Sequence, residues 1–257
     1  MKAAIITVAG ISSRFNEGVE DRRKALKAIY TTDLTSNTLL FHLLNQCRYA
    51  DRIIVVGGYR FEKLKSYMER EVSGDIRDKV VLIFNKHYMD LASGYSLYLA
   101  SEEALKLPDL EEVLFVEGDL DIDRESFQKM RETKSTVLTY NYEPIYSNKA
   151  VVFYQNKDGK YKYEFNTCHG FLKIEEPFSC ILNSGQMWKF WNIDGLRNAV
   201  NLFYEHGCEG TNLKIVQNYL DFVPKEEIRL LGLKQWANCN TREDYKKIRK
   251  RWDEEER

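Results

Sequence analysis

The chain has little of what marks several classes of protein. Four of its 257 residues are proline, and its five cysteines lie far apart and never form a C-x-x-C pair, which argues against a disulfide framework or a thiolate zinc site. The 38 Lys and Arg residues are balanced by 39 Asp and Glu residues, so no basic face for nucleic acid is expected. No apolar run approaches the ~18–20 residues of a membrane span, and no signal-like segment opens the chain. We therefore expect a cytoplasmic protein without a nucleic-acid partner or a membrane span.

Between residues 1 and 133, short apolar runs alternate with segments of helical spacing. The runs are four to six residues long and rich in Ile and Val, as strands buried on both faces of a parallel sheet are. A segment of helical spacing from Ser93 to Leu107 begins with a serine that suits a helix N-cap. The alternation predicts an open, mostly parallel α/β sheet of the Rossmann-like type. Its strands are expected at Ala3–Val8, Arg52–Val56, Val80–Phe84 and Val113–Val116.

The pattern changes after about residue 134. Aromatic, strand-like segments follow one another at short intervals, which is typical of antiparallel sheet. Because no linker-like segment separates the two halves, we expect one domain over residues 1–257 with an antiparallel insertion. The second half is expected to contain strands at Thr136–Tyr140, Ala150–Tyr154, Tyr161–Phe165, Phe171–Ile174 and Ser179–Leu182, helices around Met187–His206 and Asn212–Tyr219, and an exposed C-terminal helix from Thr241 onward.

The strongest local signal for function comes directly after the first predicted strand. A turn of small residues that leaves a buried strand exposes consecutive backbone N–H groups, which can bind phosphate oxygens. Arg14 and Lys24 would add positive charge close by. An ordinary turn with two solvated cations has the same spacing, and the segment is neither a P-loop nor G-x-G-x-x-G. The candidate phosphate-binding residues are Ala9, Gly10, Ile11, Ser12 and Ser13.

A second candidate lies about a hundred residues further along the chain. The buried run Val113–Val116 leads to Asp119. A carboxylate at the carboxyl end of a strand, opposite a phosphate-binding loop, can hold a Mg²⁺ ion that bridges phosphate oxygens. The alternative is an acidic turn or helix cap, because Asp121 and Asp123 precede a helical pattern.

These two motifs together resemble the signature of the nucleotidyltransferase superfamily that includes sugar-nucleotide pyrophosphorylases and CTP:phosphocholine cytidylyltransferases. The pattern of that superfamily is A-A-G-x-G-S/T-R, then P-K-x-L, and later an aspartate at the end of a strand. The matches occur in the order of the family across nearly the whole chain. The resemblance implies a nucleotidyltransferase fold related to the GT-A fold, with a nucleotide-binding half over residues 1–133 and an acceptor-binding half with a closing helix over residues 134–257.

The resemblance also implies roles for individual residues. It makes Arg14 and Lys24 catalytic. It adds the beginning of a helix, at Ser93, Gly94 and Ser96, to the nucleotide-binding residues. It implies a Mg²⁺ site at Asp119, Asn238 and Asn240, and it places Asn183 and Gly185 in the acceptor pocket.

The chain departs from the family pattern at several positions. Ser12 stands where the family has its second glycine and disfavours positive φ, so the loop is expected to differ slightly from that of the family. Arg23 replaces the proline. Asn238 and Asn240 replace acidic residues, and amide oxygens can bind Mg²⁺ but lack charge, so a lower metal affinity is expected. Asn240 and the following threonine also fit the N-cap of the last helix, with Glu243 near the capping-box position.

The second half is unusually rich in tyrosine. Six tyrosines fall between Tyr140 and Tyr163, and carboxylates lie nearby in the sequence. Such a set could bind a quaternary ammonium group through cation–π attraction, with Tyr140 in the acceptor pocket. Antiparallel strands are normally rich in tyrosine as well, so both interpretations stay open.

The function that these observations favour is a Mg²⁺-dependent transfer of a nucleotidyl group from a nucleoside triphosphate to a small phosphorylated acceptor. CTP with a phospho-alcohol such as phosphocholine, or a phosphonate, is the preferred pair, and a sugar-1-phosphate acceptor is the close alternative. A glycosyltransferase that uses Asp119-x-Asp121, and a catalytically silent nucleotide-binding regulator, are the alternatives from other classes. A homodimer is left open.

Overall fold

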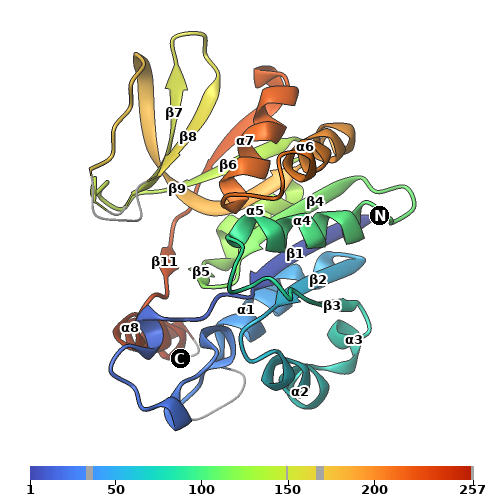
Figure 1. Cartoon of the computed structure of the whole chain (residues 1–257), viewed down its shortest axis with the longest axis vertical. Helices are drawn as coiled ribbons and strands as arrows, with labels where there is room; N and C mark the ends of the chain where they lie inside the picture. The colour runs from blue at the N-terminus through green and yellow to red at the C-terminus, as the bar shows by residue number, and fades with distance from the viewer. Residues whose placement is uncertain (33–36, 149, 166–170, 256–257) are drawn as a thin grey trace.

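The computed structural model describes residues 1–257 except 33–36, 149, 166–170 and 256–257 (Figure 1). Its strands are β1 (Lys2–Val8), β2 (Arg52–Gly57), β3 (Val80–Phe84), β4 (Glu112–Glu117), β5 (Leu120–Ile122), β6 (Thr136–Asn141), β7 (Val151–Asn156), β8 (Tyr161–Phe165), β9 (Phe178–Phe190), β10 (Ile228–Gly232) and β11 (Trp236–Asn238). Its α-helices are α1 (Leu39–Gln46), α2 (Phe61–Glu71), α3 (Gly74–Arg77), α4 (Ser93–Ala104), α5 (Arg124–Glu132), α6 (Ile193–Glu205), α7 (Asn212–Phe222) and α8 (Arg242–Glu255).

One sheet, of nine strands over the described residues, runs through the molecule in the order β10-β6-β9-β4-β1-β2-β3, and β7 and β8 extend it beside β9. Strands β4, β1, β2 and β3 run parallel to one another. Strand β9 is antiparallel to both of its neighbours in this order, β4 and β6. The predicted parallel sheet with an antiparallel second half is therefore confirmed. Strand β11 pairs separately with β5.

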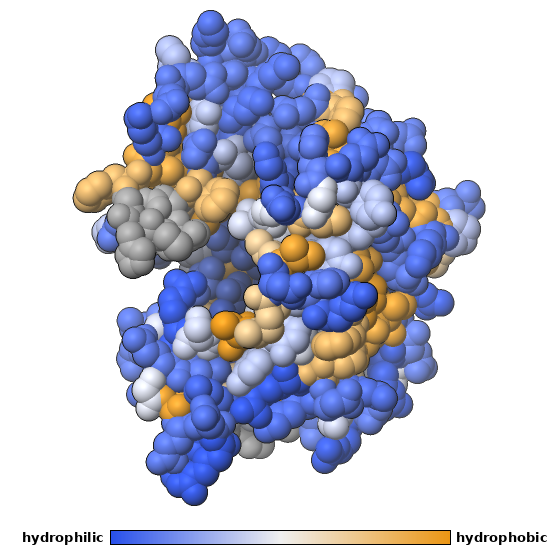
Figure 2. Space-filling model, in the orientation of Figure 1, coloured by the Kyte–Doolittle hydropathy of each residue, from blue (hydrophilic) through white to orange (hydrophobic). Residues whose placement is uncertain are grey.

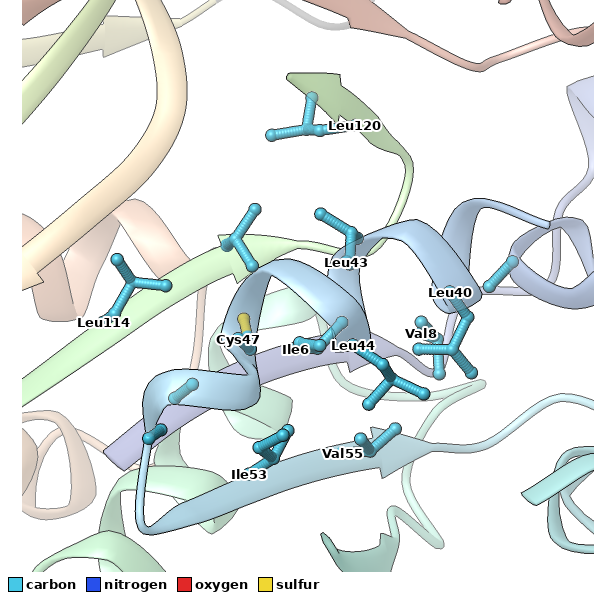
Figure 3. Close-up of a cluster of buried hydrophobic side chains, with 14 of the residues drawn as sticks. Ile6, Val8, Leu40, Leu43, Leu44, Cys47, Ile53, Val55, Leu114 and Leu120 are labelled. Atoms are coloured by element: carbon cyan, nitrogen blue, oxygen red, sulfur yellow. The ribbon is translucent and has the colours of Figure 1, made fainter. Parts of the chain in front are cut away.

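Helices cover both faces of the sheet because successive strand residues point to opposite sides. Ala4, Ile6 and Val8 of β1 pack with α1, α2 and α5 on one face. Ala3 and Ile5 pack with α4, α6 and α7 on the other face. Figure 3 shows α1 lying across the first face, with its leucines and Cys47 directed at strand residues of β1 and β2.

The second half contains the errors of the sequence prediction. Phe171–Ile174 is not a strand, and a single long strand, β9, follows it instead. This strand continues through Asn183–Gly185, beyond the predicted end at Leu182, and through Met187, where the sequence predicts a helix. The helix α6 begins at Ile193. The physical reason is a local irregularity: Gln186 has a φ of 54° and the pairing register with β6 shifts between Leu138 and Tyr140, so the strand bends without ending.

The C-terminal helix α8 is not simply exposed. Tyr245, Ile248 and Trp252 are buried in a third core cluster together with Phe15 and Leu39 from the beginning of the chain. Figure 1 shows α8 beside the N-terminal loops at the lower left. The last helix therefore packs against the beginning of the chain.

The carboxyl ends of β1 and β4 lie next to each other in the middle of the sheet. In open α/β sheets, ligands bind at this edge of the strands. Figure 2 shows the surface hollowed on the left side of the molecule, with hydrophobic side chains along the upper rim. Among the described residues, no helix combines the length and the apolar character needed to cross a membrane.

Candidate active site

A cavity of about 250 Å³ opens at the carboxyl ends of β1 and β4. Its walls come from the loop after β1, the segment that follows that loop, the beginning of α4 and the turn after β4. The two motifs that the sequence singled out, a hundred residues apart, thus face one cavity. The lining residues are Thr7, Val8, Ala9, Gly10, Ser12, Leu26, Lys27, Ala28, Asn85, Tyr88, Leu91, Ala92, Ser93, Ser96, Glu117, Gly118 and Asp119.

The loop after β1 is held in place by its own backbone and by one buried side chain. Ser12, which stands where the superfamily pattern has its second glycine, has a φ of 56°, in the left-handed region that favours glycine. A serine adopts this conformation at the cost of local strain. The side-chain amide of Asn16 donates to the carbonyl oxygen of Ala25, and its oxygen accepts from the N–H of Ala25, both at 2.9 Å. This double hydrogen bond fixes the following segment relative to the loop.

Three cations lie near the loop, and they divide into two groups. Lys27 lines the cavity, and its Nζ is 2.8 Å from Oδ2 of Asp119. Arg14 and Lys24 line a separate, more open hollow together with Ile11 and Ser13. There, Nζ of Lys24 pairs with the exposed carboxylate of Asp21 at 2.7 Å. Tyr88 borders both spaces, so the hollow adjoins the cavity.

Lys27 is a candidate that the sequence analysis missed. The superfamily pattern matches this segment at Lys24, and Lys27 lies three residues further along the chain. The sequence carries no signal for Lys27, because its place in the cavity depends on how the segment after the loop is fixed by the Asn16–Ala25 hydrogen bonds.

The opposite wall depends on a close approach of two strands. Gly118 donates its N–H to the carbonyl oxygen of Thr7 at 3.1 Å. A Cβ at Gly118 would lie 2.3 Å from Cγ1 of Val8 and 2.7 Å from that carbonyl oxygen, so only glycine fits. This contact brings Asp119 to the cavity, where its Oδ1 is buried and has no hydrogen-bond partner among the described residues.

Glu117 is a second acidic group in the cavity. One of its carboxyl oxygens accepts from the side-chain amide of Asn212 at 2.7 Å, and the hydroxyl of Ser93 donates to the amide oxygen of Asn212 at 3.0 Å. Burial and the neighbouring Asp119 raise the pKa of Glu117 to about 8. Glu117 is therefore largely protonated at neutral pH. The network ties the turn after β4 to the first residues of α4 and α7.

The beginning of α4 reaches the cavity as the resemblance implied. Ser93 and Ser96 line it, and Ser96 accepts a hydrogen bond from the amide of Asn85 at 2.9 Å. Gly94 lies behind them, where a Cβ would be 2.6 Å from the carbonyl oxygen of Gly210. Its role is to let α4 approach α7. Ser93 is the first residue of the helix and does not cap it.

The two asparagines near the C-terminus lie beside the turn that carries Asp119, outside the cavity wall. Asn238 pairs with Leu120 in the β11–β5 ladder, and its Oδ1 is buried without a partner among the described residues. The backbone N–H of Asn240 donates to Asp244. Asp244 exchanges hydrogen bonds with Thr241. Thr241 thus caps α8, as the sequence suggested, and Asp244 takes the capping-box position in place of the expected Glu243.

Oxygen donors of the kind that Mg²⁺ prefers are present at and beside the cavity. Within the described ranges, no three His, Cys, Asp or Glu side chains gather at a metal-binding distance. Mg²⁺, however, commonly binds one or two carboxylates and takes its other ligands from substrate phosphates and water. The unpartnered oxygens of Asp119 and Asn238 can supply the protein's share of such a shell.

Asp121 is not free to act together with Asp119. Its oxygens accept from Nη2 of Arg251 at 2.6 Å and from the indole N–H of Trp252 at 2.8 Å. This carboxylate anchors α8 to β5, and Asp123 caps α5 through the N–H of Ser126. An Asp119-x-Asp121 metal motif, as a glycosyltransferase would need, is therefore not available.

The three residues assigned to the acceptor pocket lie on β6 and β9, away from the cavity wall. The side-chain amide of Asn183 donates to Asn141 at 3.0 Å. Gly185 is packed so closely against Thr139 that a Cβ would be 2.5 Å from its hydroxyl oxygen. Tyr140 makes an edge contact with Tyr142. Each of these contacts holds the sheet together.

Most of the other tyrosines of the second half are used for packing. The hydroxyl of Tyr163 accepts from the indole N–H of Trp188 at 2.7 Å, and Tyr161 packs on Phe153. Tyr154 donates to Glu176 at 2.8 Å. These described contacts favour a structural role for this aromatic set.

One curated protein is similar to part of the chain. Over 99 residues the chain is 33% identical to choline-phosphate cytidylyltransferase of Haemophilus influenzae, and the match covers 38% of each protein. It therefore spans well under two thirds of that relative.

Solved structures show the likeness over the whole chain. CTP:phosphocholine cytidylyltransferase from Streptococcus pneumoniae has a TM-score of 0.65 at 17% identity, over 98% of this chain and 99% of that one. Inositol-1-phosphate CTP transferase from T. maritima has a TM-score of 0.65 at 12% identity, over 96% and 95%. UDP-glucose pyrophosphorylase complexed with UDP-glucose has a TM-score of 0.67 at 10% identity, over 99% of both chains.

At these identities the likeness shows the fold, and the nucleotidyltransferase fold inferred from the sequence is confirmed. A family model described as a domain of unknown function (DUF6564) matches residues 23–252. Because this match covers most of the chain, the protein belongs to the DUF6564 family.

Proposed function

We propose that the protein is a nucleotidyltransferase that joins a nucleoside triphosphate to a small phosphorylated acceptor and releases pyrophosphate. The observation that carries the proposal is the single cavity in which a loop of small residues, an ammonium group and a strand-end carboxylate face one another. A polyphosphate needs these three features: backbone donors, positive charge and an anchor for a cation.

The proposed chemistry is an in-line substitution at the α-phosphorus. An oxygen of the acceptor phosphate forms the new P–O bond, and the bond to the pyrophosphate oxygen breaks. Because the attacking oxygen is already ionised near neutral pH, no strong general base is needed. Catalysis then consists of positioning and of stabilising the charge that develops.

The residues around the cavity suit separate parts of this task. The backbone of Gly10–Ser13, with Arg14 in the adjoining hollow, would hold the departing pyrophosphate. Lys24 would approach the α-phosphate after leaving Asp21, since an exposed ion pair of this kind is weak. Ser93 and Ser96, at the beginning of α4, would contact the nucleoside.

Asp119 and Asn238, with Asn240 beside them, would hold Mg²⁺ together with phosphate oxygens. The ion would neutralise charge on the phosphates when bound. The unpartnered oxygens of Asp119 and Asn238 support this assignment. The single carboxylate means that the phosphates must supply much of the affinity.

CTP and a phospho-alcohol such as phosphocholine, or a phosphonate, are the proposed substrates. The support is the sequence at the beginning of α4 and the similarity to two transferases whose names include CTP or choline phosphate. A sugar-1-phosphate acceptor is the second candidate, favoured by the equal likeness to UDP-glucose pyrophosphorylase. A silent nucleotide-binding regulator is favoured by the amides at 238 and 240.

Pyrophosphate release would separate these candidates. The protein is incubated with each of the four nucleoside triphosphates, Mg²⁺, and phosphocholine, 2-aminoethylphosphonate or glucose-1-phosphate. We expect release with CTP and a phospho-alcohol or phosphonate. Release with glucose-1-phosphate alone would identify the sugar branch. No release with any pair, while a nucleotide still binds in calorimetry, would reject the enzyme in favour of the regulator.

A further inference from the structure

Lys27 is held against the wall of the cavity by the structure around it. Its backbone N–H donates to the hydroxyl of Ser12 at 3.4 Å, and the Asn16–Ala25 double hydrogen bond fixes the chain just before it. Its side chain is 16% exposed and that of Asp119 is 22% exposed. The pair is therefore largely withdrawn from water, unlike the Lys24–Asp21 pair, whose carboxylate is 93% exposed.

Both members of this pair keep unused bonding capacity. An ammonium group has three donors, and Asp119 is the residue with which Nζ of Lys27 pairs among those described. Asp119 uses one oxygen for Lys27, and its other oxygen is buried without a partner in the described part of the chain. The contact is therefore compatible with a rearrangement in which Lys27 turns to another anion.

A divalent cation and Lys27 compete for the same carboxylate. Two positive charges at one buried anion repel each other strongly, because the surroundings screen them less than water does. A triphosphate changes the balance, since it offers oxygens both to the metal ion and to the ammonium group. The nucleotide thus relieves the repulsion between the metal ion and Lys27 at Asp119.

Resting on the function proposed above, we propose that Lys27 is a tethered counter-ion for Asp119. It occupies the carboxylate in the nucleotide-free protein and moves to the phosphate chain when the metal and the nucleotide bind. Metal and nucleotide therefore bind together, with positive coupling. Lys27 acts as a positioning residue that keeps Asp119 from binding a metal ion alone.

The first test measures metal binding to the protein without nucleotide. The probe is Mn²⁺ alone, followed by electron paramagnetic resonance of the free ion. We expect Lys27→Met to bind Mn²⁺ about tenfold more tightly than the wild type, a typical size for such coupling. Lys27→Arg keeps the charge and should stay near the wild type. Lys106→Met, which removes a surface partner of Glu103, is the matched control and should change nothing.

The second test measures phosphate binding without metal. The probe is inorganic tripolyphosphate in the presence of EDTA, which tests the phosphate site independently of the base. Lys27→Met should weaken its binding about tenfold. Asp119→Asn, which is close in shape and releases Lys27, should strengthen it. In a double-mutant cycle, Asp119→Asn should increase the affinity for tripolyphosphate much less in the Lys27→Met background than in the wild type.

Two results would overturn the proposal: unchanged or weaker Mn²⁺ binding by folded Lys27→Met, or an equal gain from Asp119→Asn in both backgrounds. If Lys27→Met does not fold, as circular dichroism would show, the cycle is run with Lys27→Gln. The outcome is separable from the proposed function. A protein that passes both tests but never releases pyrophosphate would refute the transferase alone. An active transferase with unchanged Mn²⁺ binding would refute the role of Lys27 alone.

Discussion

The two sides of the fold use polar groups in opposite ways. On the nucleotide side, Asp119 and Asn238 keep buried oxygens without partners among the described residues. On the acceptor side, Asn183 bonds to Asn141, and the Tyr163 hydroxyl accepts from Trp188. Leaving a buried polar atom unpaired costs free energy, which a ligand would offset at Asp119 and Asn238, whereas the paired groups on the other side stabilise the sheet. The proposed nucleotide side is therefore the one with bonding capacity left for a ligand.

The largest expected effect tests this contrast directly. Asp119→Ala removes the charged group that faces the polyphosphate, and kcat/KM should fall ~1,000-fold, as losses of an electrostatic stabiliser do. Asn183→Ala removes a hydrogen bond of the sheet on the other side and should leave kcat/KM close to that of the wild type. Both are measured as pyrophosphate release under steady-state conditions. An equal fall in kcat for the two variants would remove the distinction between the sides.

The next effect concerns Lys24. Lys24→Ala should lower turnover ~100-fold, because a cation near the α-phosphate stabilises charge that develops in the transition state. The melting temperature should hardly change, since the Lys24–Asp21 pair is exposed and such pairs contribute little. The same assay with Lys106→Ala provides the surface control. Near-normal turnover by Lys24→Ala would show that Lys24 does not stabilise the α-phosphate.

A stability comparison sharpens the contrast at two tightly packed glycines. The Cβ of Gly118→Ala would meet the carbonyl oxygen of Thr7 and a methyl group of Val8, whereas that of Gly185→Ala would meet the side chains of Thr139 and Leu233. Backbone between two paired strands yields less than side chains do. We expect a loss of ~2–3 kcal/mol for Gly118→Ala and a smaller loss for Gly185→Ala.

Urea unfolding monitored by circular dichroism would measure both free energies of unfolding. A greater loss at Gly185 would mean that the acceptor side is the more rigid of the two.

The same contrast explains how far the sequence could predict the fold. The strands β1 to β4 are short apolar runs buried on both faces, so their composition alone located them within a residue or two. Strand β9 could not be found in this way. It runs through Asn183-Ser184-Gly185, which is typical of a turn, because pairing with β4, β6 and β7 outweighs local preference.

The candidate site shows a similar division. Ala9, Gly10 and Asp119 could be located because their positions follow from strand ends, which the sequence marks. Lys27 and Asn212 could not, since their place depends on how a loop and a distant helix return to the sheet. Asp121 is the opposite case. Its acidic pattern suggested a metal motif, but only the packed α8 shows that Arg251 and Trp252 occupy its oxygens.

A smaller effect concerns the helix that closes the nucleotide side. The ring of His42 stacks on Trp252 at 3.9 Å, and burial, with Arg124 and Arg249 nearby, lowers the pKa of His42 to about 4. In the unfolded chain the pKa is about 6.5. As the pH falls below about 6.5, His42 becomes protonated in the unfolded chain but stays neutral in the folded protein. The contribution of neutral His42 to the free energy of unfolding is thus fully present above pH 6.5 and is lost as the pH falls towards 4.

The free energy of unfolding should fall by at most ~1.4 kcal/mol per pH unit in this interval because of His42. Carboxylates titrate there as well, so the comparison uses His42→Phe, which can still stack on Trp252 but carries no proton. We expect a shallower pH profile for the variant in urea unfolding between pH 6.5 and 4. Identical profiles would show that His42 is protonated in the folded protein and that α8 tolerates the charge.

The smallest expected effect concerns the strain in the loop after β1. Ser12 has a φ of 56°, whereas its neighbour Ser13 has a φ of −58°. Ser12→Gly relieves the steric cost of the left-handed conformation but gives the unfolded chain more freedom, so a net gain of ~0.5 kcal/mol is expected. Ser13→Gly has no strain to relieve and should lose ~0.5–1 kcal/mol. Opposite signs for two adjacent serines, measured by thermal unfolding, can arise only if the loop keeps this backbone conformation in solution. Equal losses would mean that the loop adopts another backbone conformation in solution. Its backbone N–H groups would then be oriented for phosphate only when the ligand binds.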